Sequence, residues 1–323
     1  MCTRILANSN PEHIVVSRTM DWPESTHPVV TLMPRGLERD GGMLGPQRVD
    51  PSPARWRSQH ASLITSIYGI GTADGLNEHG LAGHLLYLEA TDFGPRDPSR
   101  PGLHAGLWVQ YLLDGAATVS EALKLLEDVQ LLMVSAHGRQ ASVHIALEDA
   151  SGDSAIVEHI DGAAVIHHGR EFTVMTNDPT YDEQLALLAA LDLSQPSRDM
   201  PLPGNVNARD RFQRASYYAA LMPEPSGERE AIAGVLAVAR NVSVPFGAPY
   251  GEFGIYDTEY RTVCDLVRRR YFFELTTSPS IVWTTFDAFD LTEGSPVLAF
   301  DPRADFMRSG DVSDAFQAIA APF

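Results

Sequence analysis

Residues 2–22 read CTRILANSNPEHIVVSRTMDW, and this stretch contains two strand-like runs on either side of a cluster of turn residues. The runs are CTRILA (2–7) and HIVVSRTMDW (13–22), with NSNPE between them. Apolar and β-branched residues flanking a turn cluster predict a β-hairpin. If the turn is centred near Asn10, the numbers of paired residues add up to about 20, and Cys2 faces Arg18 at a cross-strand distance of roughly 5 Å.

The next part of the chain also favours strands. The runs ASLITSIYGIG (61–71) and GLAGHLLYLEA (80–90) are apolar and bounded by glycine, which predicts buried central strands, and ADGLNEHG (73–80) between them is typical of a turn. Residues 141–177 predict a four-stranded meander with a turn at Asp161-Gly162. Asn177 is expected at the end of its last strand, where its side chain can project into a site.

Helical periodicity is confined to two blocks. Within 104–130, Thr118 and Glu121 form a capping box, and apolar residues follow at helical spacing as far as Val129. Further helices are predicted at 180–192, 208–222 and 227–239, and the tail from 261 to 286 is again rich in strands. Strands at both ends with helices in blocks favour an α+β fold, in which antiparallel sheets carry helices on their outer faces. We find no linker, so residues 1–323 are predicted to form a single domain.

Composition excludes several classes of protein. The 323 residues are 44% hydrophobic and carry a formal charge of −18, which argues against a nucleic-acid partner. No apolar run approaches the length of about 18 residues that a membrane-spanning helix needs, so we expect no membrane insertion. Residues 1–20 lack the apolar segment of a secretory signal, which favours a cytoplasmic protein. The alternative is a periplasmic or secreted protein whose native signal peptide has been replaced by Met1.

The two cysteines predict different roles. Cys264 lies in the strand-like run TVCDLV and is expected to be a small buried hydrophobe. Cys2 follows the initiator methionine, and removal of Met1 would leave a thiol and a free α-amino group on one residue. An α-amino group has a reference pKa of about 7.7 to 8.0, so it can accept or return a proton near neutral pH. A facing Arg18 would favour the thiolate, and Asp21 could anchor the amino group.

Other catalytic signatures are missing from the sequence. There is no G-x-S-x-G elbow, no P-loop and no H-E-x-x-H. His167 and His168 should point to opposite faces of one strand, which is a poor arrangement for one metal ion. We therefore expect neither a metal nor another cofactor.

Four separated blocks resemble the choloylglycine hydrolase family, which includes penicillin V acylases and conjugated bile salt hydrolases. The blocks are MCTRILANSN…VVSRTMDW, GLNEHGLAGHLLY (75–87), VMTNDPTYD (174–182) and LPGNVNARDRF (202–212). The resemblance covers residues 2 to about 300. It implies an N-terminal-nucleophile (Ntn) hydrolase fold, a four-layer αββα sandwich. It also implies a catalytic set made of the nucleophile Cys2 with Arg18, Asp21, Asn177 and Arg211.

The same resemblance implies a mechanism for a small-molecule acyl amide substrate. Cys2 attacks the amide carbonyl and forms an acyl-thioester, while the Asn177 side chain and a backbone N–H near Tyr87 hold the oxyanion. In the family, the residue matching Tyr87 tends to be aromatic in penicillin V acylases and Asn in bile salt hydrolases. Members of the Gram-negative acylase branch can also cleave N-acyl homoserine lactones. Met20, Trp22 and Tyr87 are candidates for the wall of an apolar acyl pocket.

Alternatives to this reading stay open at this point. A conjugated bile salt hydrolase is the second candidate, and a catalytically inactive relative that binds acyl amides, or a structural protein, is a third. The resemblance also implies a homotetramer. The segment between Asn177 and Arg211 is, however, shorter than in the gut-bacterial bile salt enzymes, where a longer loop helps tetramer assembly.

Overall fold

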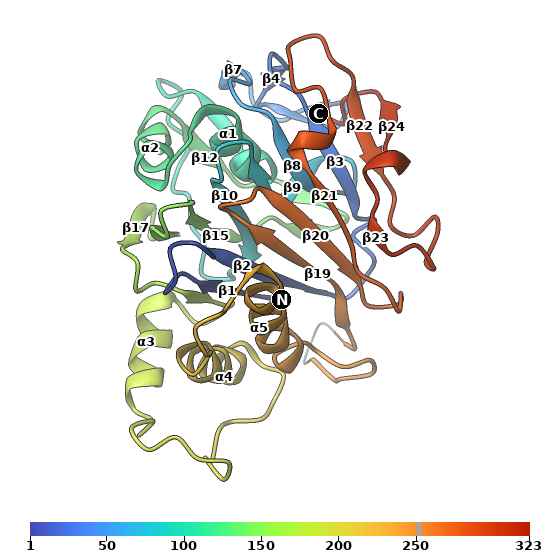
Figure 1. The fold of residues 1–323 in the computed structure, drawn as a ribbon. Coiled ribbons are helices and arrows are strands. Elements are labelled where there is room, and N and C mark those ends of the chain that lie inside the picture. The colour runs from blue at the N-terminus through green and yellow to red at the C-terminus, as the bar shows by residue number, and fades with distance from the viewer. Residues whose placement is uncertain (251–253) are drawn as a thin grey trace.

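The computed structural model describes residues 1–250 and 254–323, and most of its strands belong to two large sheets (Figure 1). The first sheet has seven strands in the order β18-β1-β2-β19-β20-β21-β23. Its pairs are antiparallel except for β21 and β23, which are parallel. The strands are β1 (Cys2–Ala7), β2 (Val15–Trp22), β18 (Val174–Met175), β19 (Asp257–Asp265), β20 (Arg270–Leu275), β21 (Val282–Thr285) and β23 (Gly310–Asp311).

The second sheet has nine strands, all paired antiparallel, in the order β17-β16-β15-β10-β9-β8-β3-β22-β24. These are β3 (Val29–Met33), β8 (Ser62–Ile67), β9 (Gly71–Asn77), β10 (Ala82–Tyr87), β15 (Val143–Glu148), β16 (Ser154–Ile160), β17 (Ala163–His168), β22 (Val297–Phe300) and β24 (Gln317–Ile319). The described residues also form four separate two-stranded ribbons: β4 (Glu38–Asp40) with β7 (Arg55–Arg57), β5 (Met43–Leu44) with β6 (Gln47–Arg48), β11 (Gly102–His104) with β12 (Gln130–Leu132), and β13 (Ser135–Ala136) with β14 (Arg139–Gln140).

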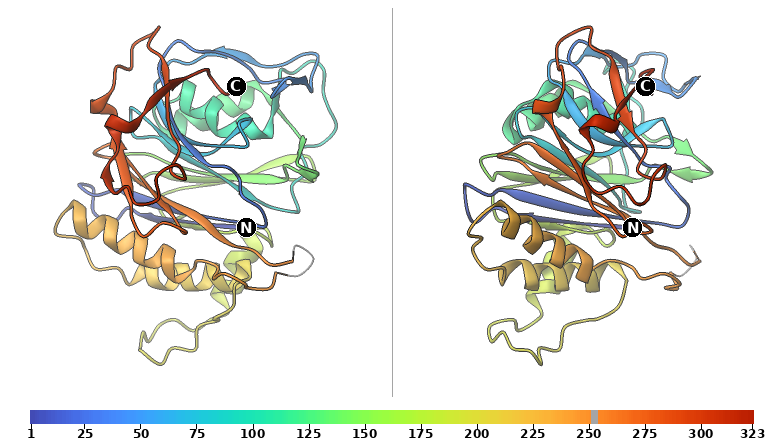
Figure 2. Two further views of the ribbon diagram at one scale, coloured as in Figure 1. Left: turned by 90° about the vertical axis from the view of Figure 1, so that its right-hand side faces the viewer. Right: turned by 45° about the vertical axis from the view of Figure 1, so that its right-hand side comes forward.

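Helices cover the outer face of each sheet, as Figure 2 shows. The nine-stranded sheet carries α1 (Trp108–Gly115), which packs on β9 and β10, with α2 (Val119–Leu125) beside it. The seven-stranded sheet carries α4 (Ala208–Ala220) on β1 and β18 and α5 (Glu228–Asn241) on β1 and β2, with α3 (Tyr181–Ala189) against α4. Short 3₁₀ turns lie at Ala105–Leu107, Leu126–Asp128, Phe286–Ala288 and Ser313–Ala315. This arrangement confirms the predicted α+β sandwich with helices outside and two sheets inside.

Two hydrophobic clusters hold these layers together. One includes Leu6, Val16 and Leu86 and continues under α4 and α5, so it joins the two sheets to each other and to the helices. The other packs α1 onto the nine-stranded sheet around the fully buried Trp108. Burial of apolar surface of this kind is the main favourable term in folding. Among the described residues, no helix combines the length and apolar character needed to cross a membrane.

The predicted hairpin is present, but its register differs from the prediction by two residues. Cys2 pairs with Met20, and Arg18 pairs with Arg4, so the hairpin is centred one residue later than Asn10. The expectation that Cys2 lies directly opposite Arg18 was therefore wrong. Because side chains alternate with a period of two along a strand, a shift by two residues keeps Cys2 and Arg18 on the same face of the sheet.

Two further expectations need correction. Most of the segment 73–80, predicted to be a turn, belongs to β9 in the middle of the nine-stranded sheet. Its polar residues are buried because partners on neighbouring elements satisfy them; Asn77, for example, donates to the carbonyls of Leu113 and Ala116. The fourth strand of the predicted meander, β18, instead joins the other sheet and pairs with β1. This crossover places Asn177 beside the start of the chain.

The helix predictions were closer. The segment 104–130 contains two short helices, α1 and α2, and the second begins at the predicted cap, where Thr118 accepts a hydrogen bond from the Glu121 amide at 3.2 Å. Val129 lies beyond the helical part, in extended backbone. The helices predicted after residue 180 correspond to α3, α4 and α5. Cys264 is fully buried in β19, which confirms its predicted character.

Candidate active site

Cys2 is the first residue of β1, and its side chain points toward the nine-stranded sheet. Its residue is only 2% exposed. Arg18 Nη2 donates to Cys2 Sγ at 3.3 Å, and Met20 Sδ lies 3.8 Å from the same sulfur. Both neighbours come from β2, because Met20 is the cross-strand partner of Cys2 and Arg18 is the next residue on that face. The hairpin alone therefore brings a cationic side chain to the thiol.

Arg18 is buried between the two sheets and reaches groups on both. Its Nη2 also donates to the Leu85 carbonyl on β10 at 3.1 Å. Its Nη1 donates to the Tyr260 hydroxyl at 2.8 Å and lies 3.4 Å from Asp74 Oδ2. Burial by itself would lower the pKa of Arg18, but the charges of Cys2, Tyr260 and Asp74 outweigh it and raise the pKa. The guanidinium therefore remains a cation beside the thiol.

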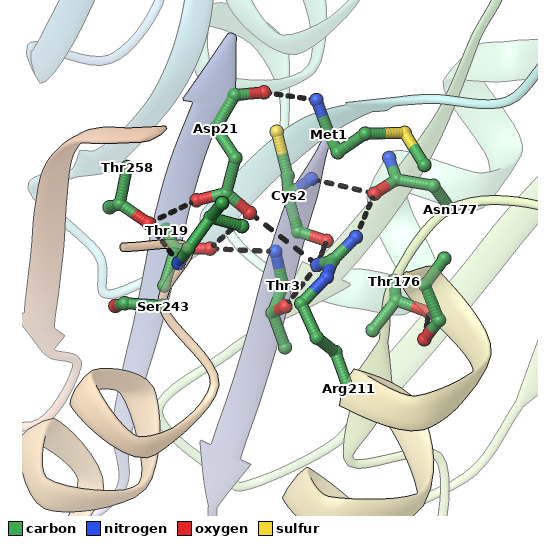
Figure 3. Close-up of polar contacts among 12 residues, drawn as sticks. Met1, Cys2, Thr3, Thr19, Asp21, Thr176, Asn177, Arg211, Ser243 and Thr258 are labelled. Atoms are coloured by element: carbon green, nitrogen blue, oxygen red, sulfur yellow. Dashed lines mark hydrogen bonds and ion pairs between the residues drawn. The ribbon is translucent and has the colours of Figure 1, made fainter. Parts of the chain in front are cut away.

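Asn177 lies on the other side of Cys2, where the chain leaves β18. Asn177 Oδ1 accepts from the Cys2 main-chain nitrogen at 2.6 Å, as Figure 3 shows. Its Nδ2 donates to the Tyr87 carbonyl at 2.6 Å, so one carboxamide connects β1 to the end of β10. The pairing of Arg4 with Met175 fixes this position, because it sets the register of β18 against β1.

Arg211 approaches the same atoms from the helical layer. It lies in the first turn of α4, whose N-cap Asn207 accepts a hydrogen bond from the Asp210 amide. Arg211 Nη1 donates to the Cys2 carbonyl at 2.6 Å, and its Nη2 donates to Asn177 Oδ1 at 2.9 Å (Figure 3). The guanidinium thus orients the first residue of β1 and the carboxamide together.

Asp21 faces the helical side of the seven-stranded sheet. Its carboxylate accepts from the Thr258 hydroxyl at 2.5 Å and lies 3.5 Å from Arg211 Nη1. Alternation along β2 turns Asp21 away from the face that carries Arg18 and Met20. With Met1 in place, the Cys2 nitrogen donates to Asn177, and the Asp21 carboxylate contacts Arg211, which also binds the Cys2 carbonyl. The predicted contact of Asp21 with a free α-amino group on Cys2 stays a prediction.

Met1 lengthens the β1–β2 pairing by one residue. Its amino group donates to the Asp21 carbonyl, and its carbonyl accepts from the Asp21 amide at 2.6 Å. Burial is the main cause that lowers the pKa of this α-amino group below its ordinary value. The Cys2 nitrogen follows directly along the chain and is itself buried against Asn177.

An apolar cavity opens beside Cys2, and all three predicted pocket residues, Met20, Trp22 and Tyr87, line it. The Trp22 and Tyr87 rings lie 5.9 Å apart, and the Arg139 guanidinium lies over Trp22 at 5.6 Å. Sequence reasoning missed the rest of the wall: Thr26, Leu44, Ile67, Tyr68, Ile70, Gly71, Ala73, Leu85, Leu86, Gly106, Val134, Arg139, Gln140, Ala141 and Val143. These come from at least five elements and share no spacing in the sequence.

One group among the described residues has the composition of a metal site, but its carboxylate is already occupied by hydrogen bonds. The possible ligand atoms of His60, Glu78 and His79 lie within 4.8 Å of one another. Both oxygens of Glu78 already accept from Arg35, and one also accepts from the Ala61 amide. A metal ion there would have to compete with a guanidinium, so we assign no metal to this group.

Comparisons with known proteins show the family to which the chain is related. The family model of linear amide C–N hydrolases, choloylglycine hydrolase family, matches residues 2–299. A penicillin V acylase from Pectobacterium atrosepticum is 36% identical over the whole chain and 91% of its own length. The solved structure of penicillin V acylase from Agrobacterium tumefaciens shares 40% identity and a TM-score of 0.89, covering 100% of this chain and 98% of that one.

A more distant solved structure supports the fold alone. The C2A mutant of conjugated bile acid hydrolase from Clostridium perfringens superposes with a TM-score of 0.79 at 18% identity, covering 93% of this chain and 96% of that one.

Proposed function

The chain belongs to the choloylglycine hydrolase family of linear amide C–N hydrolases, and we propose that it is a penicillin V acylase-like amidohydrolase with Cys2 as its nucleophile. One observation carries the assignment of the nucleophile. The Cys2 sulfur lines an apolar cavity, with the Arg18 guanidinium 3.3 Å away and the Asn177 carboxamide on the main-chain nitrogen of the same residue. These are the parts that acyl transfer needs: a nucleophile, a neighbouring cation and a polar group at the reacting end.

The proposed reaction begins after Met1 has been removed. The free α-amino group of Cys2 accepts the thiol proton, and the thiolate attacks the amide carbonyl carbon to form a C–S bond. The C–N bond then breaks, and the α-amino group returns the proton to the leaving amine. Water, deprotonated by the same amino group, hydrolyses the thioester, releases the carboxylic acid and restores the thiol.

The oxyanion of the tetrahedral intermediate needs hydrogen-bond donors near Cys2. Asn177 Nδ2 is one candidate, because Asn177 already contacts the Cys2 nitrogen through its other amide atom. The main-chain N–H of Tyr87 is the second. The N–H and C=O of one strand residue point to the same side of the strand, and the Tyr87 carbonyl points to Asn177. Donors aimed at developing charge supply much of the rate enhancement in acyl transfer.

Substrate preference is proposed from the relatives and from the cavity wall. Two relatives that align over the whole chain, at 36% and 40% identity, are named penicillin V acylases. Trp22 and Tyr87 add aromatic surface suited to an aryloxyacetyl group, and aliphatic residues such as Ile67 and Leu86 would accept a fatty acyl chain. N-acyl homoserine lactones are therefore proposed as further substrates. Conjugated bile salts are the second candidate, supported by the relationship of the fold to a bile acid hydrolase.

The domain organisation and the assembly of the protein are also proposed. We propose one domain over residues 1–323, because β1 and β2 from the start of the chain pair with β18 and β19 from its second half. A homo-oligomer, a tetramer by family resemblance, would also cover exposed apolar side chains such as Phe306 and Met307. Light scattering coupled to size exclusion tests this assembly.

A hydrolysis panel with matched variants tests the proposed function. Wild-type protein is assayed against penicillin V, acyl homoserine lactones, glycocholate and taurocholate, beside Cys2→Ala and Cys264→Ala. We expect penicillin V to be hydrolysed by the wild type and by Cys264→Ala but not by Cys2→Ala. The control is apt because burial raises the pKa of the Cys264 thiol well above its ordinary range, which leaves it an unreactive thiol.

Each other outcome of the panel has a definite meaning. Turnover of conjugated bile salts alone would replace the acylase assignment with the second candidate. Turnover that survives Cys2→Ala would remove Cys2 as the nucleophile. Absence of turnover on every amide would support an inactive, acyl-amide-binding relative.

A further inference from the structure

We propose that Asp74 is a positioning residue for the amidohydrolase reaction: it fixes the Arg18 guanidinium against the Cys2 sulfur from the opposite sheet. This inference rests on the proposed function, because it needs Cys2 to be the nucleophile. Asp74 lies on β9, in the segment whose pattern predicts a turn, and it is fully buried. Its carboxylate reaches Cys2 only through Arg18.

The hydrogen bonds around Asp74 hold it in one orientation. Asp74 Oδ2 accepts from the Thr262 hydroxyl at 2.9 Å and lies 3.4 Å from Arg18 Nη1. Asp74 Oδ1 accepts from the Tyr271 hydroxyl, which lies 2.6 Å from the Thr65 hydroxyl. A buried carboxylate with donors on both oxygens has little freedom to turn, so it is a fixed point for the guanidinium.

Arg18 needs such a fixed point because its guanidinium has several acceptors. Cys2 Sγ and the Leu85 carbonyl lie at Nη2, while Tyr260 and Asp74 lie at Nη1. The planar group can aim Nη2 at the sulfur only when Nη1 is held on the opposite side. The guanidinium carbon also lies 5.4 Å from the centre of the Tyr260 ring, which limits rotation out of this plane.

Asp74 is absent from the cavity wall, although its neighbour Ala73 belongs to it. A substrate in the cavity can therefore contact Ala73 but not the Asp74 carboxylate. We infer that loss of the Asp74 charge lowers kcat and leaves KM nearly unchanged, since it misplaces a group at the reacting sulfur without removing a substrate contact.

The hairpin itself provides a matched control. Arg4 is the cross-strand partner of Arg18, points into the same space between the sheets, and also pairs with a fully buried carboxylate of the nine-stranded sheet. Arg4 Nε donates to Glu148 Oε2 at 2.9 Å. Glu148→Gln therefore disturbs an ion pair of the same kind and burial, but one that makes no contact with Cys2.

The test compares Asp74→Asn with Glu148→Gln in penicillin V hydrolysis, with the folded fraction of each measured by circular dichroism. We expect Asp74→Asn to lower kcat about 10- to 100-fold with KM changed less than about threefold. Glu148→Gln should keep the wild-type kcat per folded molecule. Wild-type kcat in folded Asp74→Asn, or equal losses in the two variants, would overturn the inference.

A double-mutant cycle shows whether Asp74 acts through Arg18. In an Arg18→Lys background, one ammonium group cannot hold Cys2 and Asp74 together, so adding Asp74→Asn should cause no further loss of kcat. A further loss of about 10-fold or more would mean that Asp74 acts independently. If Asp74→Asn does not fold, Tyr271→Phe provides the test, because it removes the hydrogen bond to Asp74 Oδ1. We expect it to lower kcat about 2- to 10-fold, and an unchanged kcat would overturn the inference.

These outcomes are separable from a failure of the proposed function. If Cys2→Ala retains activity, the nucleophile assignment fails, and the role of Asp74 fails with it. If Cys2→Ala is inactive while folded Asp74→Asn hydrolyses penicillin V like the wild type, only the positioning role is lost.

Discussion

At the scale of single residues, alternation along β1 and β2 separates two sets of contacts around Cys2. Arg18 and Met20 lie with the Cys2 sulfur on the face toward the nine-stranded sheet. Thr3 and Asp21 face the helical layer, where both contact Arg211. The sulfur and the main-chain nitrogen of Cys2 are thus controlled from opposite sides of one sheet. Asn177 is the residue that connects the nitrogen to the cavity side, through Tyr87.

Asn177→Ala removes the proposed side-chain donor for the oxyanion. Loss of one such donor typically costs about 10² to 10³ in kcat, and we expect a fall of that size with a smaller change in KM. Steady-state kinetics on penicillin V, with a melting curve to confirm folding, provide the measurement. Asn8→Ala is a suitable control, since the Asn8 side chain donates to the carbonyls of Gly152 and Arg170, which are not residues of the site. A fall of less than about tenfold would argue against Asn177 as a donor.

At the scale of elements, β1 is the strand on which the site depends. It pairs with β2 on one side and β18 on the other, and α4 and α5 pack on it. Its first residue, Cys2, therefore contacts side chains from three parts of the chain: Arg18 on β2, Asn177 after β18 and Arg211 on α4. Met1 occupies the end of the same ladder through its two bonds to Asp21.

This pairing predicts that Met1 is removed before the strand is formed. A peptidase needs the terminus to detach, which breaks two hydrogen bonds of about 1 kcal/mol each and reduces the accessible form about 30-fold. Purified protein that retains Met1 is treated with methionine aminopeptidase. We expect slow loss of Met1 from the folded protein. The loss should be much faster at a urea concentration that unfolds this protein but leaves the peptidase active. Intact-mass spectrometry over time measures both rates. Equal rates would show that the terminus is already detached in the folded protein.

At the scale of the whole molecule, segments from both ends of the chain form one sheet. β19, from residues 257–265, pairs with β2 and completes the environment of Arg18 through Tyr260. Two histidines in and around the other sheet, the buried His104 and the partly buried His159, make the stability of the fold depend on pH. Burial lowers the pKa of His104 to about 4, although the Met43 carbonyl on its ring opposes the effect. Burial likewise lowers the pKa of His159 to about 4.

These pKa shifts predict acid destabilisation. Between about pH 6.5 and pH 4 the unfolded chain binds protons at these histidines and the folded chain does not, so the free energy of unfolding falls as the pH falls. For His104 the effect approaches about 3 kcal/mol at pH 4. Urea titrations at pH 7, 6 and 5 measure it. His104→Gln should weaken the dependence, and an equal slope in wild type and His104→Gln would contradict the prediction.

The sequence by itself determined the secondary structure of the hairpin, the helices that follow residue 180 and the α+β class, because these depend on local periodicity and turn chemistry. It also picked out Cys2, Arg18 and Asp21 from the hairpin and the chain start, placed Asn177 at a strand end, and added Arg211 through the family motifs. Three of these, Cys2, Arg18 and Asp21, lie on one hairpin, and even a register error of two residues kept Cys2 and Arg18 on one face.

Only the tertiary structure decided which elements meet at the site. Asp74 has the local sequence of a turn, yet pairing with β8 and β10 and the hydroxyls of Thr262 and Tyr271 stabilise it in a buried strand. β18 pairs with β1 and not with the strands of the meander. A strand of two residues is too short for its sequence pattern to predict this partner. The cavity wall, likewise, is assembled from segments far apart in the chain. Such features depend on pairing between distant strands and on burial, and neither can be predicted from the local sequence pattern.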